Sequence, residues 1–201
     1  MSAARTVKTL ALRRVRQEDA AALAGIYAPF VRDTAVTFEY DAPDAEEFAR
    51  RIAETSPTYP YLAAEADGRV IAYAYAHRFA VRAAYGWSAE TSIYVDPAYC
   101  GCGVGRALYG ALLQLLTMQR VQTAYAILAL PNPASAGLQE ALGFTLSGSY
   151  HRVGYKHGRW LDTAVYEKPL GTYAVPPTPM LPFASLDPAA VDAVLRQYSL
   201  L

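Results

Sequence analysis

One stretch decides the fold of this chain: Glu90-Thr-Ser-Ile-Tyr-Val-Asp-Pro-Ala-Tyr-Cys-Gly-Cys-Gly-Val-Gly-Arg-Ala-Leu-Tyr-Gly-Ala-Leu-Leu113. It begins with a strand-like segment, and Gly101, Gly103 and Gly105 then lead into an apolar, helix-like pattern. A strand that enters a helix through such a turn aims free backbone N–H groups and the positive end of the helix dipole at one point. This geometry favours an anionic ligand such as a pyrophosphate.

Other uses of a glycine-rich turn fit this sequence less well. No Lys-Ser or Lys-Thr pair follows Gly105, which argues against the P-loop of nucleoside triphosphatases. The unit also lies in the middle of the chain rather than in a first βαβ unit, which argues against a dinucleotide-binding fold. A glycine-rich connection without any ligand stays open as the alternative.

Composition and charge narrow the class of protein. Eighteen basic and eighteen acidic side chains balance, so we expect a small-molecule partner rather than nucleic acid or a membrane. Cys100 and Cys102 are too close for an ordinary disulfide and too few for a zinc site, so we expect no metal and a reduced, cytoplasmic protein. The stretch 1–5 lacks an apolar signal region, and no run approaches the roughly 20 apolar residues of a membrane helix.

The remaining pattern predicts an α+β or mixed α/β domain. We expect strands at 8–16, 61–66, 69–78, 88–95 and 121–130, helices at 17–31, 43–54, 104–119 and 135–142, and two final strands around the turn 154–158. Asp67-Gly68 is a strong hairpin signal between the second and third strands.

The chain changes character after residue 170, which predicts a domain over 1–170 and an appendage over 171–201. Four prolines between 176 and 182 indicate an extended linker. Asp187 then caps a short helix whose apolar stripe is Val191, Val194, Leu195 and Tyr198. This helix docks either on the domain or on a second subunit, with an independent partner-binding role as the alternative.

The glycine-rich stretch resembles the Arg/Gln-x-x-Gly-x-Gly/Ala pyrophosphate loop of the GNAT superfamily of N-acetyltransferases, with residues 100–105 in its place. Within that superfamily the chain resembles phosphinothricin and methionine sulfoximine acetyltransferases. The segments that carry this resemblance are 84–95, 130–135, 138–144 and 154–162, and the similarity spreads from about residue 10 to residue 170.

This resemblance implies the GNAT fold and acetyl-CoA as the co-substrate. In that fold a mixed, mostly antiparallel sheet is flanked by helices, and two parallel strands splay apart around the pantetheine arm. By resemblance, the backbone of Ile93, Tyr94 and Val95 bonds that arm, and Asn132 meets the pantetheine or the departing thiol. The pyrophosphate would be held by Gly101, Cys102, Gly103, Val104, Gly105 and Arg106.

A base is needed because an α-amine is mostly ammonium at neutral pH and only the neutral form attacks a thioester. Glu90 is the candidate, since the resemblance implies that it faces the amine through water; an exposed strand glutamate is the alternative. The phosphinothricin enzymes also carry a histidine where this chain has Gln139, an amide that cannot act as a base near neutrality. Tyr109 and Tyr150 are candidate acids for the CoA thiolate.

We expect the acceptor amino acid to bind near Arg78, Arg82 and Tyr85, because a guanidinium group can bind a carboxylate through two parallel hydrogen bonds. By resemblance, Phe38 and Glu39 lie in a loop that covers the acceptor. Exposed surface arginines are the alternative interpretation. Lys156, His157, Arg159 and Trp160, at the last hairpin, lie near the site by resemblance, without an assigned chemistry.

These features together predict acetyl transfer to the α-amine of a small amino acid or analogue, by direct attack in a ternary complex. The alternatives are acetylation of another amine, such as a polyamine, an antibiotic or a peptide N-terminus, and a noncatalytic acyl-CoA-binding module. A homodimer that shares the last hairpin fits the family. Cys102 lies at a helix N-terminus, so we also hypothesise that its alkylation blocks acetyl-CoA, with a neutral substitution as the alternative.

Overall fold

Seven strands make up the sheet of the computed structural model, which describes residue 7 and residues 9–199. They are β1 (Ala11–Arg14), β2 (Tyr61–Ala66), β3 (Arg69–Arg78), β4 (Ser88–Val95), β5 (Thr123–Ala129), β6 (Thr145–Lys156) and β7 (Arg159–Pro169). Their spatial order is β1-β2-β3-β4-β5-β7-β6, and of these described strands only β4 and β5 run parallel to each other. The predicted mixed, mostly antiparallel sheet is confirmed.

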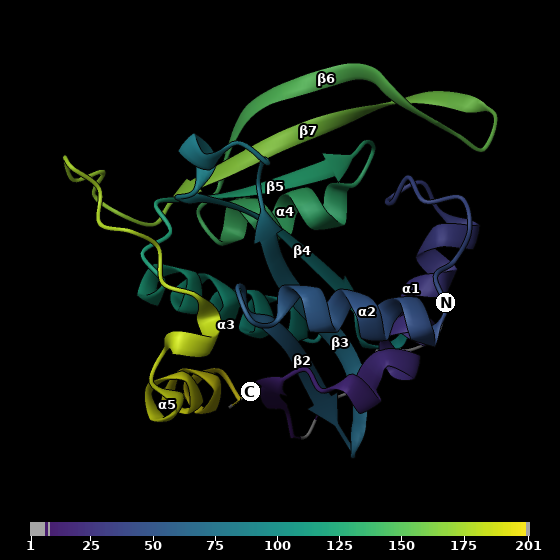
Figure 1. Cartoon of the computed structure of the whole chain (residues 1–201). Helices are drawn as coiled ribbons and strands as arrows, with labels where there is room; N and C mark the ends of the chain where they lie inside the picture. Colours follow the sequence, from purple (N-terminus) through teal and green to yellow (C-terminus); the bar gives the residue numbers. More distant parts are fainter. Residues whose placement is uncertain (1–6, 8, 200–201) are drawn as a thin grey trace.

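The helices pack on both faces of this sheet (Figure 1). They are α1 (Ala20–Asp33), α2 (Ala45–Thr55), α3 (Val104–Met118), α4 (Pro133–Ala141) and α5 (Pro188–Tyr198). On one face, α1 and α2 bury Phe48 and Ile52 against Tyr61 and Tyr73 of the sheet. On the other face, α3 and α5 share a second apolar core. The sheet therefore has an α1/α2 face and an α3 face.

Small side chains on the sheet let α3 approach closely. The buried strand residues of this core include Ala72, Ala74, Ala76, Ala89, Ala124 and Ala126. The helix contributes the predicted apolar stripe, Leu108, Leu112, Leu115 and Leu116, which is fully buried. Burial of each leucine stabilises the fold by about 1.5–3 kcal/mol, so this contact holds the glycine turn at the start of α3 in a fixed position against β4.

Some element boundaries differ from the predictions. The first strand spans only Ala11–Arg14 rather than 8–16; residue 8 and the stretch 1–5 lie outside the described residues. α4 starts at Pro133, two residues earlier than predicted, because the Asn132 side chain accepts a hydrogen bond from the Ser135 N–H and caps the helix. Proline suits the first helical position, where its missing N–H has no partner to lose.

The C-terminal segment runs back along the domain to α3. Asp187 caps α5 through a 3.0 Å bond from the Ala189 N–H, which confirms that prediction. α5 packs on α3 and β1, and the ring of Tyr198 lies directly against Gly110 of α3. Buried Gln119, just after α3, donates to the carbonyls of Thr58 and Leu181 and so ties this segment to the domain. Across the described residues, no helix has the length and apolar character to cross a bilayer.

Candidate active site

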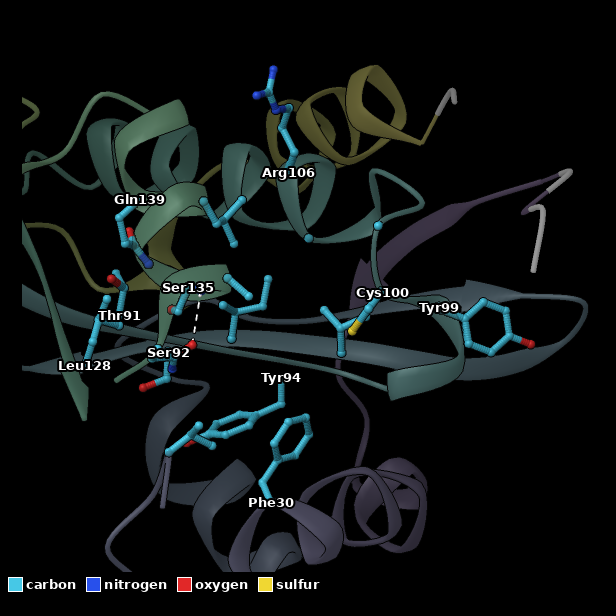
Figure 2. A pocket seen from close by; sticks show the side chains of 18 of the residues that line it. Phe30, Thr91, Ser92, Tyr94, Tyr99, Cys100, Arg106, Leu128, Ser135 and Gln139 are labelled. Carbon is cyan, nitrogen blue, oxygen red and sulfur yellow. Dashed lines mark hydrogen bonds between the residues drawn. The ribbon is translucent and has the colours of Figure 1, made fainter. Parts of the chain in front are cut away.

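The parallel strands β4 and β5 separate after a short paired stretch. Their register pairs Ser88 with Thr123, Ala89 with Ala124 and Glu90 with Tyr125, and no later pair joins them in the described chain. The gap opens into a cavity of about 370 Å³ (Figure 2). This divergence confirms the predicted pair of splayed strands, and it leaves one backbone edge of residues 91–95 without a neighbouring strand.

This cavity passes through the sheet from one face to the other. Phe30 and Val36 line it on the α1/α2 face, whereas Leu138 and Gln139 of α4 line it on the α3 face. In Figure 2, Phe30 and Tyr94 lie below the β4 ribbon, and Ser135 and Gln139 lie above it. A long ligand can therefore lie along the α3 face and present one end to the opposite face.

The glycine turn closes one end of the cavity. Gly103 caps α3 with φ of 82°, and Gly101 has φ of 79°, so both adopt the left-handed conformation that glycine tolerates best. The first N–H groups of α3 have no partner within the helix, and the positive end of the helix dipole lies there too. Gly103, Gly105 and Arg106 of this segment line the cavity. The turn has the features of an anion site.

Most of the predicted cofactor residues line this cavity. They are Ile93, Tyr94, Val95, Gly101, Gly103, Gly105, Arg106 and Asn132. Cys102 and Val104 do not line it: the Val104 side chain is fully buried in the core, and the Cys102 thiol lies 3.8 Å from the Cys100 carbonyl oxygen. At these two positions only the backbone is left to bind a ligand.

Hydrogen bonds behind the cavity link α4, α3 and β5. The Gln139 Nε2 group donates to the Tyr109 hydroxyl at 3.3 Å, and Tyr109 is bonded to Thr91. Thr91 donates in turn to the Tyr125 carbonyl at 2.7 Å, so the Tyr109 proton points to Thr91. Burial raises the pKa of Tyr109 to about 12. Gln139 thus acts as a buried donor in a network that fixes β4.

The two faces of β4 carry different chemistry. Thr91, Ile93 and Val95 point to the α3 face, where Ile93 and Val95 lie 3.8 Å from the position of a Cβ on Gly105. Glu90 and Tyr94 point to the α1/α2 face. The Glu90 carboxylate lies 3.8 Å from Nε2 of His77, and its side chain is 22% exposed. Burial raises the pKa of Glu90, partly offset by His77, so it suits a base that works near neutral pH.

A second cavity, of about 230 Å³, lies on the α1/α2 face beside Glu90. Its lining includes His77, Arg51 and four tyrosines, Tyr27, Tyr61, Tyr73 and Tyr75. The motifs identified in the sequence do not include the residues of this cavity. The signal was available in the sequence, because Tyr73, Tyr75 and His77 alternate along β3 and therefore share one face of the sheet.

The predicted acceptor residues fall into two groups. Phe38 and Glu39 lie in the loop after α1, where Glu39 pairs with Arg51 at 2.9 Å and accepts a bond from the Tyr27 hydroxyl. Arg78, Arg82 and Tyr85 lie at the connection between β3 and β4 and are all exposed. Glu39 is thus engaged by protein groups. Arg78 is also engaged, because its guanidinium donates to the Val81 carbonyl at 3.3 Å and bonds to Tyr59, whereas Arg82 and Tyr85 are exposed.

The tip of the β6–β7 hairpin holds the loop over the α1/α2 face. The Lys156 side chain is almost fully buried and donates to the Thr37 carbonyl at 2.8 Å, and burial lowers its pKa. His157 contacts the Thr34 carbonyl at 3.1 Å. The Phe38 ring lies so close to Gly154 that a Cβ there would be 2.2 Å from it. The hairpin is therefore a structural partner of the acceptor loop within the same chain.

The cysteine at the mouth of the cavity is not activated. Cys100 lines the cavity, and burial together with the charge of Asp96 raises the pKa of its thiol. A reactive cysteine requires the opposite shift. Cys100 therefore lacks the property of a covalent nucleophile.

The sheet splits at the parallel pair β4 and β5, and the N-terminus of α3 lies at one end of the gap. This is the arrangement expected of an acetyl-CoA-dependent N-acetyltransferase. The family description "Acetyltransferase (GNAT) domain" matches residues 12–165, and the chain belongs to this family. Acetyl-CoA is its co-substrate.

The similar proteins include enzymes named phosphinothricin and methionine sulfoximine acetyltransferases, and also one named ribosomal-protein-alanine N-acetyltransferase, from Brucella melitensis. The phosphinothricin N-acetyltransferase of Streptomyces viridochromogenes is 32% identical over 87% of this chain and 95% of its own. The L-methionine sulfoximine/L-methionine sulfone acetyltransferase of Salmonella typhimurium is 31% identical over 83% of this chain and 98% of its own. A phosphinothricin acetyltransferase from Sinorhizobium meliloti, solved with acetyl-CoA, has a TM-score of 0.80 and 37% identity over 86% of this chain and 94% of its own.

Proposed function

We propose that this enzyme acetylates the α-amine of a small amino acid or analogue of the phosphinothricin and methionine sulfoximine type. One observation carries the proposal: Glu90 lies on the α1/α2 face at the last pair before β4 and β5 separate, and it directly precedes Thr91, which lines the cavity. The named relatives, which act on amino-acid analogues, support the same acceptor class.

The residues present fit acetyl-CoA, which supplies an acetyl group activated as a thioester. The free backbone edge of Ile93, Tyr94 and Val95 binds the pantetheine arm, as an added strand would. The N–H groups at the start of α3 bind the pyrophosphate. Asn132 uses its side-chain oxygen to cap α4, so its amide N–H₂ remains to meet the pantetheine or the thiol.

Glu90 removes the proton that keeps the amine from attacking. Its raised pKa makes the carboxylate a stronger base than an exposed glutamate, which helps it to accept a proton from an ammonium group. The amine then attacks the acetyl group directly within a ternary complex. The raised pKa of the Cys100 thiol, which lines the cavity, argues against an acetylated enzyme intermediate.

The acceptor's carboxylate binds to the exposed arginines at the β3–β4 connection. Arg78 and Arg82 follow β3, and Tyr85 adds an aromatic wall with Phe79, whose ring stacks on Tyr125 at 4.3 Å. Tyr125 is the register partner of Glu90, so this wall adjoins the base. The loop that carries Phe38 and Glu39 covers the same side.

The test is a thiol-release assay with acetyl-CoA and a panel of amines: phosphinothricin, methionine sulfoximine, methionine sulfone, the common amino acids, a polyamine and a peptide with a free N-terminus. The proposal predicts saturable turnover with at least one amino acid or analogue. It predicts no turnover with a derivative of that compound in which the amine is methylated and the carboxylate is amidated. Turnover confined to the polyamine or the peptide would contradict the proposed class of acceptor.

The same proposal extends to the assembly and to the C-terminal segment. Leu146, Tyr150, Val153, Tyr155 and Trp160 are large exposed side chains on β6 and β7, and they support a homodimer that pairs these hairpins. The segment 171–199 forms a structural appendage that packs α5 on α3 and β1. Cys100 is not joined in a disulfide, which supports a cytoplasmic location. Sedimentation of the wild type and of Trp160→Glu tests the dimer, which should dissociate in the variant.

A further inference from the structure

His77 faces Glu90 directly across the β3–β4 ladder, where the two residues are register partners. Its Nδ1 atom lies 3.0 Å from the Arg78 carbonyl oxygen, and its Nε2 atom lies 3.8 Å from Oε1 of Glu90. A carbonyl oxygen can only accept a hydrogen bond, so Nδ1 carries a hydrogen. In the neutral ring, Nε2 therefore presents a lone pair to the carboxylate.

A protonated carboxyl group is a hydrogen-bond donor, and the Nε2 lone pair of the neutral ring is an acceptor. A proton that arrives on Glu90 therefore has an acceptor at Nε2 of His77. The gap exceeds a hydrogen bond by about 0.8 Å, which a rotation of the glutamate or one bridging water closes.

The surroundings of His77 lead outward to solvent. Its side chain is 40% exposed, compared with 22% for Glu90, and it lines the tyrosine-walled second cavity. The groups around it are Tyr75, whose ring centroid lies 6.0 Å away, Arg78 next to it on β3, and Arg51 of α2 across the cavity. Glu39 and Glu47 pair with Arg51, so its charge does not repel a proton on the imidazole strongly.

We propose that His77 is a positioning residue that acts through Glu90 and carries the amine's proton away. The proton moves from the ammonium nitrogen to Oε1 of Glu90; the O–H bond then breaks as an N–H bond forms at Nε2, which restores the carboxylate. The Arg78 carbonyl stabilises the imidazolium through Nδ1–H, and the proton leaves from Nε2 to water. This inference rests on the proposed role of Glu90 as the base.

The first test reads the tautomer and needs no activity. The chain has three histidines, so ¹⁵N-histidine labelling gives few signals, and His77→Gln assigns the one that disappears. At a pH where the rings are neutral, His77 should carry its hydrogen on Nδ1 and not on Nε2. A hydrogen on Nε2 would overturn the proposal, because that nitrogen could then accept nothing from Glu90.

The second test reads proton transfer. We expect His77→Gln to lower kcat about 10-fold without changing the KM for acetyl-CoA, and added imidazole to restore kcat in proportion to its concentration. The matched control is His151→Gln, which alters an exposed histidine on β6 and should change neither kcat nor the response to imidazole. A His77→Gln enzyme of normal melting temperature with full kcat, or with a lowered kcat that imidazole does not restore, contradicts the relay.

The Glu90→Gln variant separates this inference from the proposed function. If Glu90→Gln keeps wild-type kcat, the proposed base is wrong, whatever His77 does. If Glu90→Gln loses activity while His77→Gln does not, the proposed function stands and the relay fails.

Discussion

The two faces of β4 use different means of recognition. On the α3 face, the proposed cofactor site is built mainly from the backbone and left-handed glycines of the stretch 91–106, with α4 completing the wall. On the α1/α2 face, the side chains around Glu90 come from α1, α2, β3, β5 and the tip of the β6–β7 hairpin. A cofactor common to a family can be bound by a local backbone motif, whereas an acceptor is selected by side chains that only the complete fold brings together.

The largest expected effect is loss of the base on the α1/α2 face. Glu90→Gln keeps the shape but cannot accept a proton, so kcat should fall by about 10²–10⁴ while the KM for acetyl-CoA stays within twofold. Steady-state kinetics with both substrates varied measure this. If the KM for acetyl-CoA rose by as large a factor as kcat fell, Glu90 would also contribute to cofactor binding, and the two faces would not act separately.

The pH dependence of activity tests the role of Glu90 as the base. Burial raises the pKa of Glu90, so the basic form is lost at a higher pH than for an ordinary glutamate, and activity falls as the pH drops through this raised value. The acid limb of kcat/KM should therefore lie above about 4.3, the ordinary glutamate value. The measurement needs an acceptor whose amine does not titrate over the pH range of the acid limb. An acid limb at or below that value would contradict the assignment of Glu90 as the base.

On the α3 face, the sensitive position is Gly103. A valine there must adopt a φ of 82°, which is strained for a β-branched residue, and its side chain enters the end of the cavity. We expect the KM for acetyl-CoA to rise at least 10-fold, with a smaller change in the KM for the acceptor. Gly25→Ala is the control, because a Cβ there meets no atom within 4 Å and α1 tolerates alanine.

The hairpin contact should affect the acceptor alone. In Gly154→Ala, the new Cβ would overlap the Phe38 ring and must displace that ring from its place over the α1/α2 face. The acceptor KM should rise about 3- to 10-fold, with the KM for acetyl-CoA unchanged, because the loop's contacts with the hairpin are lost. Gly148→Ala, in the same strand and with open space around its Cβ, should leave both constants unchanged.

The smallest effect on catalysis is expected from α5. Leu195 is buried between α5 and the domain core, so Leu195→Ala should lower the free energy of unfolding by about 2–3 kcal/mol through lost contacts and a cavity. Activity at a temperature well below the melting point should remain near that of the wild type. Chemical denaturation measures the first quantity; a large loss of kcat would show that α5 takes part in the site.

The contrast between the faces also explains how much the sequence alone could predict. The order of strands and helices, the glycine turn and the cofactor edge were predictable, because each depends on residues close together in the chain. The contact from Lys156 to Thr37 and the tyrosine-lined second cavity were not, since they join segments far apart in sequence. From the sequence, Gln139 is only an amide that cannot act as a base. Its role as a hydrogen-bond donor depends on Tyr109 and Thr91, which only the fold brings close to it.

The most direct test of this division of β4 is a crystal structure of the enzyme with CoA and a bound acceptor or its acetylated product. The account predicts that the pantetheine arm pairs with the backbone of residues 93–95, and that the acceptor nitrogen lies on the α1/α2 face, within a hydrogen bond or one water of Glu90. An acceptor nitrogen on the α3 face, beside Tyr109 and Gln139 and away from Glu90, would contradict it.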